Sequence, residues 1–463
     1  MTIMMDLLEA AKAMAGRLEG SNLGFSGVST DSRTITEGEL FVALRGGNFD
    51  GHQFIENARK NGAVAAVIDT RAFLETGDHH IPYVVVDDTR LALGQLACYW
   101  RSRFVLPLLA VTGSNGKTTT KEMLSSIFHL AYKEKMLATQ GNLNNDIGMP
   151  MTLLKLNADH QAAIIEMGMN RPGEINYLTG IAKPTVALVT NVQRAHLAGM
   201  GTLEAIAIEK GQIFEGLGKS GIAVFCADEP WALMWKEQNR ERTVWDFSFE
   251  RDAKVTGRYQ RCGFDNYLEI GVGSEQKTVH LFVPGQHNAY NALAAATMAL
   301  ATGISLEHIG AGLENFTGVS RRLQKREGKH NALLIDDTYN ANPDSVRAAI
   351  DVLAATLGKK ILVLGDMREV GDKCAQLHDE IGSYAKSQGI DRLYALGEAS
   401  MQAVRNFDTG GRHFKKAGDL ITAVISELTP ETTILVKGSR SMRMERIADA
   451  IALHPGERSD HAA

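Results

Sequence analysis

The residues with the clearest chemical potential form a short glycine-containing loop between an apolar run and a helical stretch. The loop reads GSNGKTT, and we predict that it binds a nucleoside triphosphate through Gly113, Ser114, Asn115, Gly116, Lys117, Thr118 and Thr119. Glycines let backbone N–H groups face phosphate oxygens, a lysine reaches the terminal phosphates, and the following hydroxyl can hold Mg²⁺. Val111 stands where the strict GxxxxGK[ST] pattern has its first glycine, so the alternative is an ordinary turn between a strand and a helix.

Two further side chains could complete a metal site near this loop. Glu166 lies near the end of the predicted strand Ala162–Met167, where a carboxylate can face bound phosphates through Mg²⁺. His196 follows the predicted strand Thr185–Thr190. Taken alone, a glutamate at a strand end can equally be a surface residue, and a lone histidine is more often structural.

Lys210 occupies an unusual position for a charged residue. It falls on the apolar stripe of the predicted helix Leu203–Leu217, whose other members are Leu203, Ile206, Ala207, Ile213, Phe214 and Leu217. Such a lysine is neutral or paired inside the protein, or it buries its stem and extends the ammonium to water. If desolvation lowers its pKa, the neutral amine can take up CO₂ and form a carbamate able to ligate Mg²⁺.

Three series of strands and helices must position these groups. At about 150 residues per domain, the 463 residues predict about three domains. Continuous apolar runs separated by helices favour parallel sheets covered on both faces. We therefore expect an α/β protein with domains over residues 1–86, 87–317 and 318–463. The strands predicted beyond those above are Glu39–Leu44, Ala63–Ile68, Leu106–Val111, Gly221–Cys226, Ala332–Ile335, Lys360–Leu364, Arg392–Leu396 and Thr433–Val436, with a helix of small residues over Asn291–Gly303.

Composition excludes several classes of protein. Hydrophobic residues make up 44% and charged residues 22%, which is typical of a globular chain, and the net charge of −5 offers no basic field for nucleic acid or an anionic membrane. The four cysteines are far apart, which disfavours a disulfide framework or a zinc site. The N-terminal segment carries Asp6 and Glu9 and is predicted to form an amphipathic helix rather than a signal peptide. We expect a cytoplasmic enzyme without membrane insertion, and nothing in the sequence requires more than a monomer.

Seven segments together resemble the Mur ligase family, the ATP-dependent amide ligases of peptidoglycan precursor synthesis. In family order they are TGSNGKTTT, GNLNNDIGMP, IEMGMN, NVQRAHL, the EKG around Lys210, GQHNAYNALAA and DDTYNANPDS. Within the family, STDSRTITEGELFVALRGGNFDGHQF and DDTYNANPDS are most similar to the branch that adds D-alanyl-D-alanine to UDP-N-acetylmuramoyl-tripeptide. The resemblance implies an N-terminal UDP-binding α/β domain, a central P-loop ATPase-like domain with a parallel sheet, and a C-terminal Rossmann-like domain.

The resemblance also implies roles for individual residues. It implies ATP and two Mg²⁺ ions, with Lys117, Glu166, His196 and a carbamylated Lys210 as catalytic groups and Thr118 as a further metal ligand. Other expected nucleotide contacts are Asn288, Asn291, Arg322 and Asp337. Expected substrate contacts are Ser29, Asp31, Ser32, Arg33, Asp50, His52, Asn142, Asn144, Asn145 and Lys437. The family usually carries Gly-Arg where this chain has Arg321-Arg322, so either arginine could make the contact.

Lys437 is also a candidate from its position alone. It ends the predicted strand Thr433–Val436 and precedes Gly438 and a helix start, a natural seat for an anion. The alternative is a solvated lysine at a strand end.

Two other functions share an ATP-binding loop. One is a sister ligase, such as a folate-glutamate ligase or a muropeptide-recycling enzyme; the DSRTITEGELFVALRG segment argues against the folate branch. The other is a regulatory ATPase, which would hydrolyse ATP without any peptide acceptor. A ligase of the implied branch would instead activate the tripeptide carboxylate as an acyl phosphate before the dipeptide amine attacks it.

Overall fold

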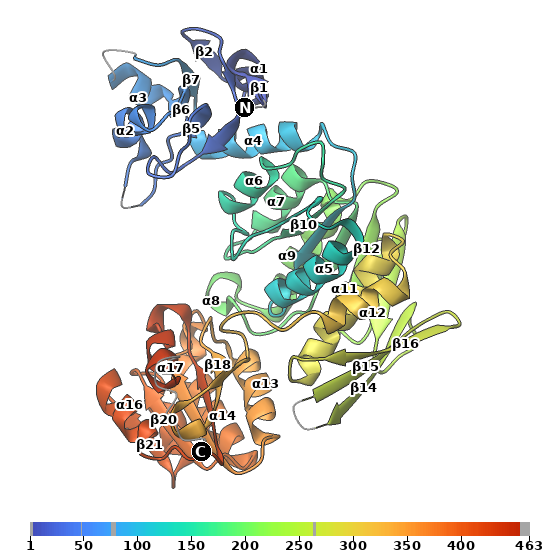
Figure 1. Ribbon diagram of the computed structural model, residues 1–463, viewed down its shortest axis with the longest axis vertical. Helices are drawn as coiled ribbons and strands as arrows, with labels where there is room; N and C mark the ends of the chain where they lie inside the picture. Colours follow the sequence, from blue (N-terminus) through green and yellow to red (C-terminus); the bar gives the residue numbers. More distant parts are fainter. Residues whose placement is uncertain (1–2, 48, 76–79, 263–264, 454–463) are drawn as a thin grey trace, which may run out of the picture.

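The computed structural model describes residues 3–47, 49–75, 80–262 and 265–453, and within these ranges each of three α/β domains is built on its own sheet (Figure 1). The N-terminal domain lies at one end of the molecule, the central domain in the middle and the C-terminal domain at the other end. The fold class predicted from the alternating apolar runs and helices is confirmed.

The N-terminal domain has a sheet of order β2-β7-β6-β5-β4, in which only the β2–β7 pair is antiparallel. Its strands are β2 (Arg17–Glu19), β4 (Gly27–Ser29), β5 (Glu39–Val42), β6 (Ala65–Asp69) and β7 (Tyr83–Val86), beside a small pair β1 (Met5–Asp6) and β3 (Gly24–Phe25). Its helices are α1 (Leu7–Ala13), α2 (Ile55–Lys60) and α3 (Thr70–Glu75), with a 3₁₀ turn over Gly51–Phe54. The amphipathic helix predicted at the N-terminus is α1, preceded by β1.

Helix α4 (Thr89–Arg101) joins this domain to the central one. Asp88 begins the helix, since its carboxylate accepts hydrogen bonds from the backbone N–H groups of Arg90 and Leu91. The buried face of α4 belongs to a core that contains side chains of both domains, among them Leu40 and Leu108. The two domains are therefore packed through one continuous apolar core.

The central domain carries the longest sheet, of order β16-β15-β14-β13-β12-β11-β8-β10-β9. Its strands are β8 (Leu108–Thr112), β9 (Met136–Ala138), β10 (Ala162–Glu166), β11 (Val186–Val189), β12 (Ile222–Cys226), β13 (Thr243–Ser248), β14 (Val255–Cys262), β15 (Asp265–Val272) and β16 (Glu275–Leu281). Its helices are α5 (Lys117–Tyr132), α6 (Gly148–Leu153), α7 (Glu174–Ala182), α8 (Leu197–Met200), α9 (Leu203–Gly211), α10 (Ala232–Gln238), α11 (Gln286–Ala301) and α12 (Leu306–Glu314).

Two details of this domain differ from the sequence prediction. A parallel sheet was expected throughout, but β14, β15 and β16 form an antiparallel meander at one edge. Gly273, with φ of +57°, lies in the tight turn between β15 and β16, and a short turn of this kind can join only antiparallel neighbours. The helix predicted over Leu203–Leu217 is α9 followed by a 3₁₀ turn over Gln212–Gly216.

The C-terminal domain has a sheet of order β17-β18-β22-β19-β20-β21, parallel except for the β17 edge. Its strands are β17 (Gln324–Glu327), β18 (Leu333–Asp337), β19 (Lys359–Gly365), β20 (Arg392–Leu396), β21 (Gly411–Phe414) and β22 (Thr432–Lys437). Its helices are α13 (Pro343–Ala354), α14 (Cys374–Ser387), α15 (Met401–Phe407), α16 (Ala417–Ile425) and α17 (Glu445–Ile451), with 3₁₀ turns at Lys329–Asn331, Gly371–Lys373 and Arg440–Met442. None of the helices described in the chain is both long and apolar enough to cross a bilayer.

Candidate active site

A cavity of about 980 Å³ lies where the central and C-terminal domains meet. The carboxyl ends of β8, β10 and β11 border it from the central domain, and those of β18 and β22 border it from the C-terminal domain. Loops at the carboxyl edge of a parallel sheet are where such proteins bind ligands. Expected site residues that line the cavity are Ser114, Asn115, Gly116, Lys117, Thr118, Thr119, Asn144, Asn145, Glu166, His196, Asn288, Asn291, Arg322, Asp337 and Lys437.

The glycine-containing loop connects β8 to α5 and presents the start of that helix to the cavity. Gly116 immediately precedes α5 with φ of +83°, and a Cβ there would lie 2.1 Å from Asn291 Oδ1, so only glycine fits. The Lys117 ammonium donates to the carbonyl of Gly113 at 2.7 Å and to that of Ser114 at 3.3 Å. Burial lowers the pKa of Lys117, and the positive charge of Arg322 lowers it further, against the opposing effect of Glu166. The loop geometry is that of an anion site at a helix N-terminus.

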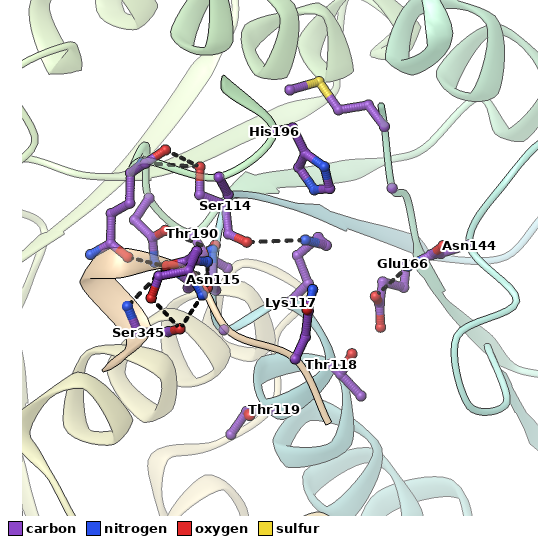
Figure 2. A pocket seen from close by; sticks show the side chains of 18 of the residues that line it. Ser114, Asn115, Lys117, Thr118, Thr119, Asn144, Glu166, Thr190, His196 and Ser345 are labelled. Atoms are coloured by element: carbon purple, nitrogen blue, oxygen red, sulfur yellow. Dashed lines mark hydrogen bonds between the residues drawn. The ribbon is translucent and has the colours of Figure 1, made fainter. Parts of the chain in front are cut away.

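One carboxylate oxygen of Glu166 has no hydrogen-bond partner among the described residues. The residue is 1% exposed at the end of β10, and its Oε1 accepts from Asn144 Nδ2 at 2.7 Å. Its Oε2 is buried and, among the described residues, receives no hydrogen bond. Figure 2 shows Glu166, Lys117, Thr118 and His196 around the same part of the cavity. An unpaired buried carboxylate oxygen is costly unless a ligand satisfies it, which favours a cation at this position.

Lys210 lies inside the central domain, 1% exposed on α9. Of the predicted apolar stripe, Ile206, Ala207, Ile213, Phe214 and Leu217 are buried with Lys210, but the prediction is wrong at Leu203, which is 39% exposed at the start of α9. Across the described part of the chain its ammonium makes no hydrogen bond or ion pair, and Glu209 is the one acidic group whose charge acts on it. Burial holds its pKa well below the usual lysine range, and the nearby charge of Lys117 lowers it further. At 1% exposure the Lys210 side chain is buried in the protein and does not extend along its surface.

His196 stands between the two domains at the start of α8. Its Nδ1 pairs with Glu369 Oε2 of the C-terminal domain at 3.1 Å, and its backbone has φ of +58°. No cluster of three or more His, Cys, Asp or Glu side chains suited to a metal ion occurs within the described ranges. Of the expected metal ligands, Thr118, Glu166 and His196 line the cavity, whereas Lys210 lies outside its lining.

The structure distinguishes the two neighbouring arginines. Arg322 points into the cavity, where its guanidinium donates to Thr118 Oγ1 at 3.0 Å and stacks 4.0 Å from the Tyr339 ring. Its buried Nε has no acceptor among the residues described. Arg321 instead pairs with Glu445 at 3.8 Å. Arg322 is thus the arginine available to a ligand at the phosphate loop.

Lys437 and Asp337 form a buried pair on neighbouring parallel strands. They are register partners on β22 and β18, and Lys437 Nζ donates to Asp337 Oδ2 at 2.5 Å and to the Asn340 carbonyl at 3.0 Å. Lys437 is 3% exposed, so the solvated strand-end alternative is wrong. Burial raises the pKa of Asp337, although the Lys437 ammonium opposes the shift. Both side chains line the cavity.

Asn288 and Asn291 lie in the first turns of α11. Asn291 Nδ2 donates to Asn288 Oδ1 at 3.1 Å, and Asn288 Nδ2 donates to the Pro284 carbonyl at 2.7 Å. Neighbouring His287 also lines the cavity, and burial lowers its pKa to about 4, so it is neutral at pH 7.

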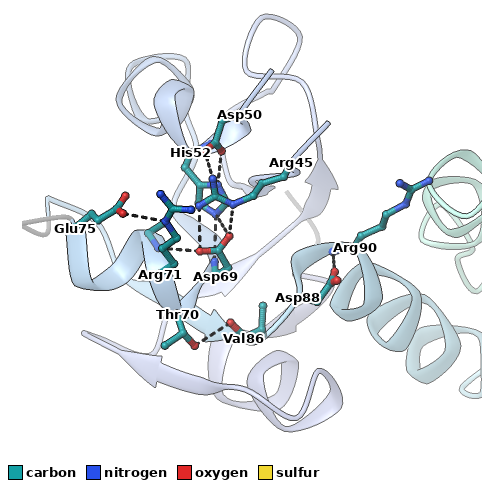
Figure 3. Close-up of polar contacts among 11 residues, drawn as sticks. Arg45, Asp50, His52, Asp69, Thr70, Arg71, Glu75, Val86, Asp88 and Arg90 are labelled. Carbon is teal, nitrogen blue, oxygen red and sulfur yellow. Dashed lines mark hydrogen bonds and ion pairs between the residues drawn. The ribbon is translucent and has the colours of Figure 1, made fainter. Parts of the chain in front are cut away.

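The expected UDP-binding residues do not line this cavity. Ser29, Asp31, Ser32, Arg33, Asp50 and His52 all lie in the N-terminal domain, and Asn142 also lies outside the lining. Asp50 and His52 belong to a local network in which Asp50 Oδ1 contacts His52 Nδ1 at 2.6 Å and Arg45 contacts both Asp50 and Asp69 (Figure 3). Asp31 pairs with Arg33 at 2.6 Å, and this hydrogen bond lowers the pKa of Asp31 to about 2.

Of the residues that join the two domains beside the cavity, sequence reasoning named Asn115 and His196 but missed Arg194, Asp344 and Asn342. Arg194 pairs with Asp344 at 2.7 Å, and Asn115 and Asn342 exchange side-chain hydrogen bonds. A partial signal exists, because Asn342 followed by a proline and an acidic residue is typical of a helix start. That signal locates α13 but not its partner in the other domain.

Comparison with known proteins identifies relatives over nearly the whole chain. The family model "Mur ligase family, catalytic domain" matches residues 24–101, "Mur ligase middle domain" matches residues 111–299, and "Mur ligase, glutamate ligase domain" matches residues 321–440. The UDP-N-acetylmuramoyl-tripeptide–D-alanyl-D-alanine ligase of Escherichia coli (strain K12) is 40% identical over 455 residues, which cover 97% of this chain and 98% of that one.

Solved structures agree with this result. The crystal structure of MurF from Acinetobacter baumannii matches with a TM-score of 0.90 and 34% identity over 96% of this chain and 98% of that one. The structure of the MurF ligase from Thermotoga maritima in complex with ADP matches with a TM-score of 0.80 and 27% identity over 92% of this chain and 96% of that one. The resemblance predicted from the seven sequence segments is confirmed.

Proposed function

The chain belongs to the Mur ligase family, and on that premise we propose that it joins D-alanyl-D-alanine to UDP-N-acetylmuramoyl-tripeptide using ATP. The observation that carries this proposal is the convergence of two sets of groups in one cavity. Lys117, Thr118 and Glu166 come from the central domain, and Arg322 and Lys437 come from the C-terminal domain. A cavity of about 980 Å³ has room for a nucleotide together with the reacting end of a peptide substrate.

The bond to be made explains why cationic groups gather here. A terminal carboxylate oxygen of the tripeptide attacks the γ-phosphorus of ATP, the bond to ADP breaks, and an acyl phosphate forms. The dipeptide amine then attacks the acyl carbon and loses a proton, and the carbon–oxygen bond to phosphate breaks to leave the amide. Negative charge accumulates on the transferring phosphoryl group and then on the acyl oxygen, so positioned cations stabilise both transition states. Lys117 and Arg322 are placed to do this at the phosphate loop.

The residues present fit Mg²⁺. Glu166 offers a buried oxygen with no partner among the described residues, and Thr118 offers a hydroxyl at the start of α5. Oxygen ligands of this kind, together with nucleotide phosphates, are what Mg²⁺ binds in phosphoryl-transfer enzymes. Bound Mg²⁺ would neutralise phosphate charge, and we propose two ions held by Thr118, Glu166, His196 and a modified Lys210.

Lys210 is our proposed site of carbamylation. The neutral amine attacks the carbon of CO₂ and loses one proton, which converts a buried base into an anionic metal ligand. Three observations support this: Lys210 is 1% exposed, its ammonium has no partner in the described structure, and burial holds its pKa well below normal. A buried unpaired ammonium would be costly, whereas a carbamate beside Mg²⁺ and Lys117 would be paired.

The remaining assignments follow the domain arrangement. We propose that residues 1–86 hold the UDP end of the substrate through Ser29, Asp31, Ser32, Arg33, Asp50 and His52. Residues 87–317 would bind ATP, with Gly113–Thr119, Asn288 and Asn291 at the nucleotide and Asn142, Asn144 and Asn145 at the sugar-peptide. Residues 318–463 would bring Arg322, Asp337 and Lys437 to the reaction.

We further propose that the enzyme works as a monomer in the cytoplasm. Cys98, Cys226 and Cys374 carry free thiols, which fits a reducing compartment.

The test is phosphate release with ATP, Mg²⁺, UDP-N-acetylmuramoyl-tripeptide and D-alanyl-D-alanine, omitting each component in turn. We expect release to require all four and the pentapeptide product to appear by mass spectrometry. Phosphate release from ATP alone, unchanged by either acceptor, would indicate a regulatory ATPase and contradict the proposal. Replacing the dipeptide by glutamate, and the tripeptide by a folate, tests the sister-ligase alternative.

A further inference from the structure

Arg194 connects the central domain to the C-terminal domain through both its backbone and its side chain. Its backbone N–H donates to Asp344 Oδ2 at 2.7 Å, and its guanidinium donates to Asp344 Oδ1 at 2.7 and 3.0 Å. The remaining guanidinium nitrogen donates to Glu380 Oε2 at 3.1 Å. The side chains of Arg194 and Asp344 are 26% and 23% exposed, so the pair is partly shielded from water and salt. Multiple hydrogen bonds to one carboxylate fix the orientation of the two domains as well as their distance.

A second contact joins the phosphate loop itself to the same place. Asn342 Nδ2 donates to Asn115 Oδ1 at 2.8 Å, and Asn115 Nδ2 donates to Asn342 Oδ1 at 3.3 Å. We call the Arg194–Asp344 and Asn115–Asn342 pairs together the interdomain clamp. Asn115 lies within the loop that begins α5, so this half of the clamp acts directly on the phosphate-binding backbone.

Both pairs end at the start of helix α13, which is a rigid part of the C-terminal domain. Asn342 caps this helix, since its Oδ1 also accepts from the backbone N–H of Ser345 at 2.9 Å. Asp344 lies in the first turn, where a carboxylate is stabilised by the helix dipole. Any rotation of the C-terminal domain therefore moves both clamp residues together.

On the other side, the segment that carries Arg194 holds the phosphate loop. The backbone N–H of Ser114 donates to the Asn191 carbonyl at 3.0 Å, and the backbone N–H of Gln193 donates to Ser114 Oγ at 2.9 Å. The backbone N–H of Asn115 donates to Asn191 Oδ1 at 3.0 Å. The phosphate loop, residues 190–194 and the start of α13 thus form one continuous hydrogen-bonded unit across the domain boundary.

We infer that Arg194 and Asn342 are positioning residues for the ligation reaction: they hold the phosphate loop against α13 and so set the distance between groups carried by different domains. This inference rests on the proposed function. The Arg322–Thr118 contact and the His196–Glu369 pair also cross the domain boundary. The clamp adds contacts at the phosphate loop itself and so keeps Arg322 and Lys437 aligned with that loop. A misplacement of about 1 Å in such a site costs about 100-fold in rate.

The experiment compares steady-state kinetics of Arg194→Ala and Asn342→Asp with the unsubstituted enzyme. Asn342→Asp keeps an oxygen to cap α13 but removes the amide that donates to Asn115, so it tests the clamp without removing the cap. We expect each substitution to lower kcat by about 10- to 100-fold. We expect the KM for the UDP-tripeptide to change by less than about twofold, because in our proposal the N-terminal and central domains hold this substrate. Arg240→Ala, which removes an exposed pair with Glu237 inside the central domain, is the matched control and should leave kcat unchanged.

Two further measurements separate positioning from folding. Thermal unfolding should show no loss of stability in Asn342→Asp, and Arg194→Lys should recover part of the kcat lost in Arg194→Ala. Small-angle scattering with a non-hydrolysable ATP analogue should show a larger radius of gyration for Arg194→Ala than for Arg240→Ala.

Normal kcat in both Arg194→Ala and Asn342→Asp, in a preparation whose unsubstituted enzyme ligates, would overturn the inference. So would a fall in kcat that tracks a fall in unfolding temperature across all variants. Failure of the unsubstituted enzyme to ligate would refute the proposed function instead, and the scattering comparison would still decide whether the clamp holds the domains.

Discussion

Replacement of Lys210 by methionine tests the carbamate proposed on this residue. Methionine is apolar and of similar length, so it fills the space of a side chain that is 1% exposed but cannot be carbamylated. Ile206 and Ala207 on α9 are also buried, and Glu209 and Lys117 are the charged neighbours, so the substitution removes the amine without leaving a cavity. Lys210→Met should therefore be folded and inactive.

The two expected effects differ enough in size to be separated. A volume-conserving change in a core costs less than about 1.5 kcal/mol, so the unfolding free energy should change little. Loss of one charged group that stabilises the transition state costs about 2.7–4 kcal/mol, or about 10²–10³ in kcat. An activity loss of this size in a protein of normal stability cannot come from misfolding.

The assay is phosphate release coupled to product detection, with thermal unfolding measured on the same samples. Lys210→Ala is the partner variant, because it leaves a cavity that a short carboxylate such as formate or acetate can enter. We expect added carboxylate to restore part of the activity of Lys210→Ala but none of Lys210→Met, whose side chain occupies that space.

The pH dependence gives an independent check. Carbamate formation needs the neutral amine, and burial lowers the pKa of Lys210, so the reactive form is more abundant than for an exposed lysine and declines as the pH falls through that lowered pKa. Removing CO₂ from the wild-type enzyme should therefore reduce activity increasingly as the pH is lowered, and bicarbonate should restore it. Full activity of Lys210→Met without CO₂ would refute the carbamate and with it the proposed second metal ligand.

Three other substitutions test separate parts of the site. Glu166→Gln removes the buried charge proposed to bind Mg²⁺, and we expect kcat to fall about 10²–10³-fold and the Mg²⁺ concentration for half-maximal activity to rise; unchanged metal dependence would contradict the assignment. Arg322→Ala should lower kcat/KM for ATP about 10-fold or more, because Arg322 contacts Thr118. Arg321→Ala should change kcat/KM little, because Arg321 pairs with Glu445 instead. Equal effects of the two substitutions in an ATP titration would contradict the choice of Arg322. Burial raises the pKa of Glu229 from 4.5 to about 7, so the folded state holds this proton more tightly than the unfolded state, and the stability of the wild type should decline between about pH 4.5 and 7. Glu229→Gln should remove about 1–3 kcal/mol of that decline, measured by denaturant titration at each pH. Parallel plots of unfolding free energy against pH for the two proteins would disprove this prediction.

Much of the site is encoded in local sequence. The phosphate loop is a strand, a glycine turn and a helix start within a dozen residues, so its shape follows from its own composition. Glu166 and Lys437 end predicted strands, and parallel strands place their carboxyl ends at one edge. Lys210 falls on the apolar face by helical periodicity alone.

Other properties depend on residues far apart in the chain. The choice between Arg321 and Arg322 depends on the contact with Thr118, 204 residues away, and the clamp joins Arg194 to Asp344 across 150 residues. No local pattern encodes such a pairing, because the position of one domain on another is set by the packing of whole surfaces. The antiparallel edge β14–β16 was likewise missed, because the strands were predicted from continuous apolar runs, whereas polar and apolar residues mix along these three strands. The sequence by itself determined which groups could handle phosphate and metal; tertiary structure decided which of them meet, because the reacting groups come from two domains that each fold by their own local rules.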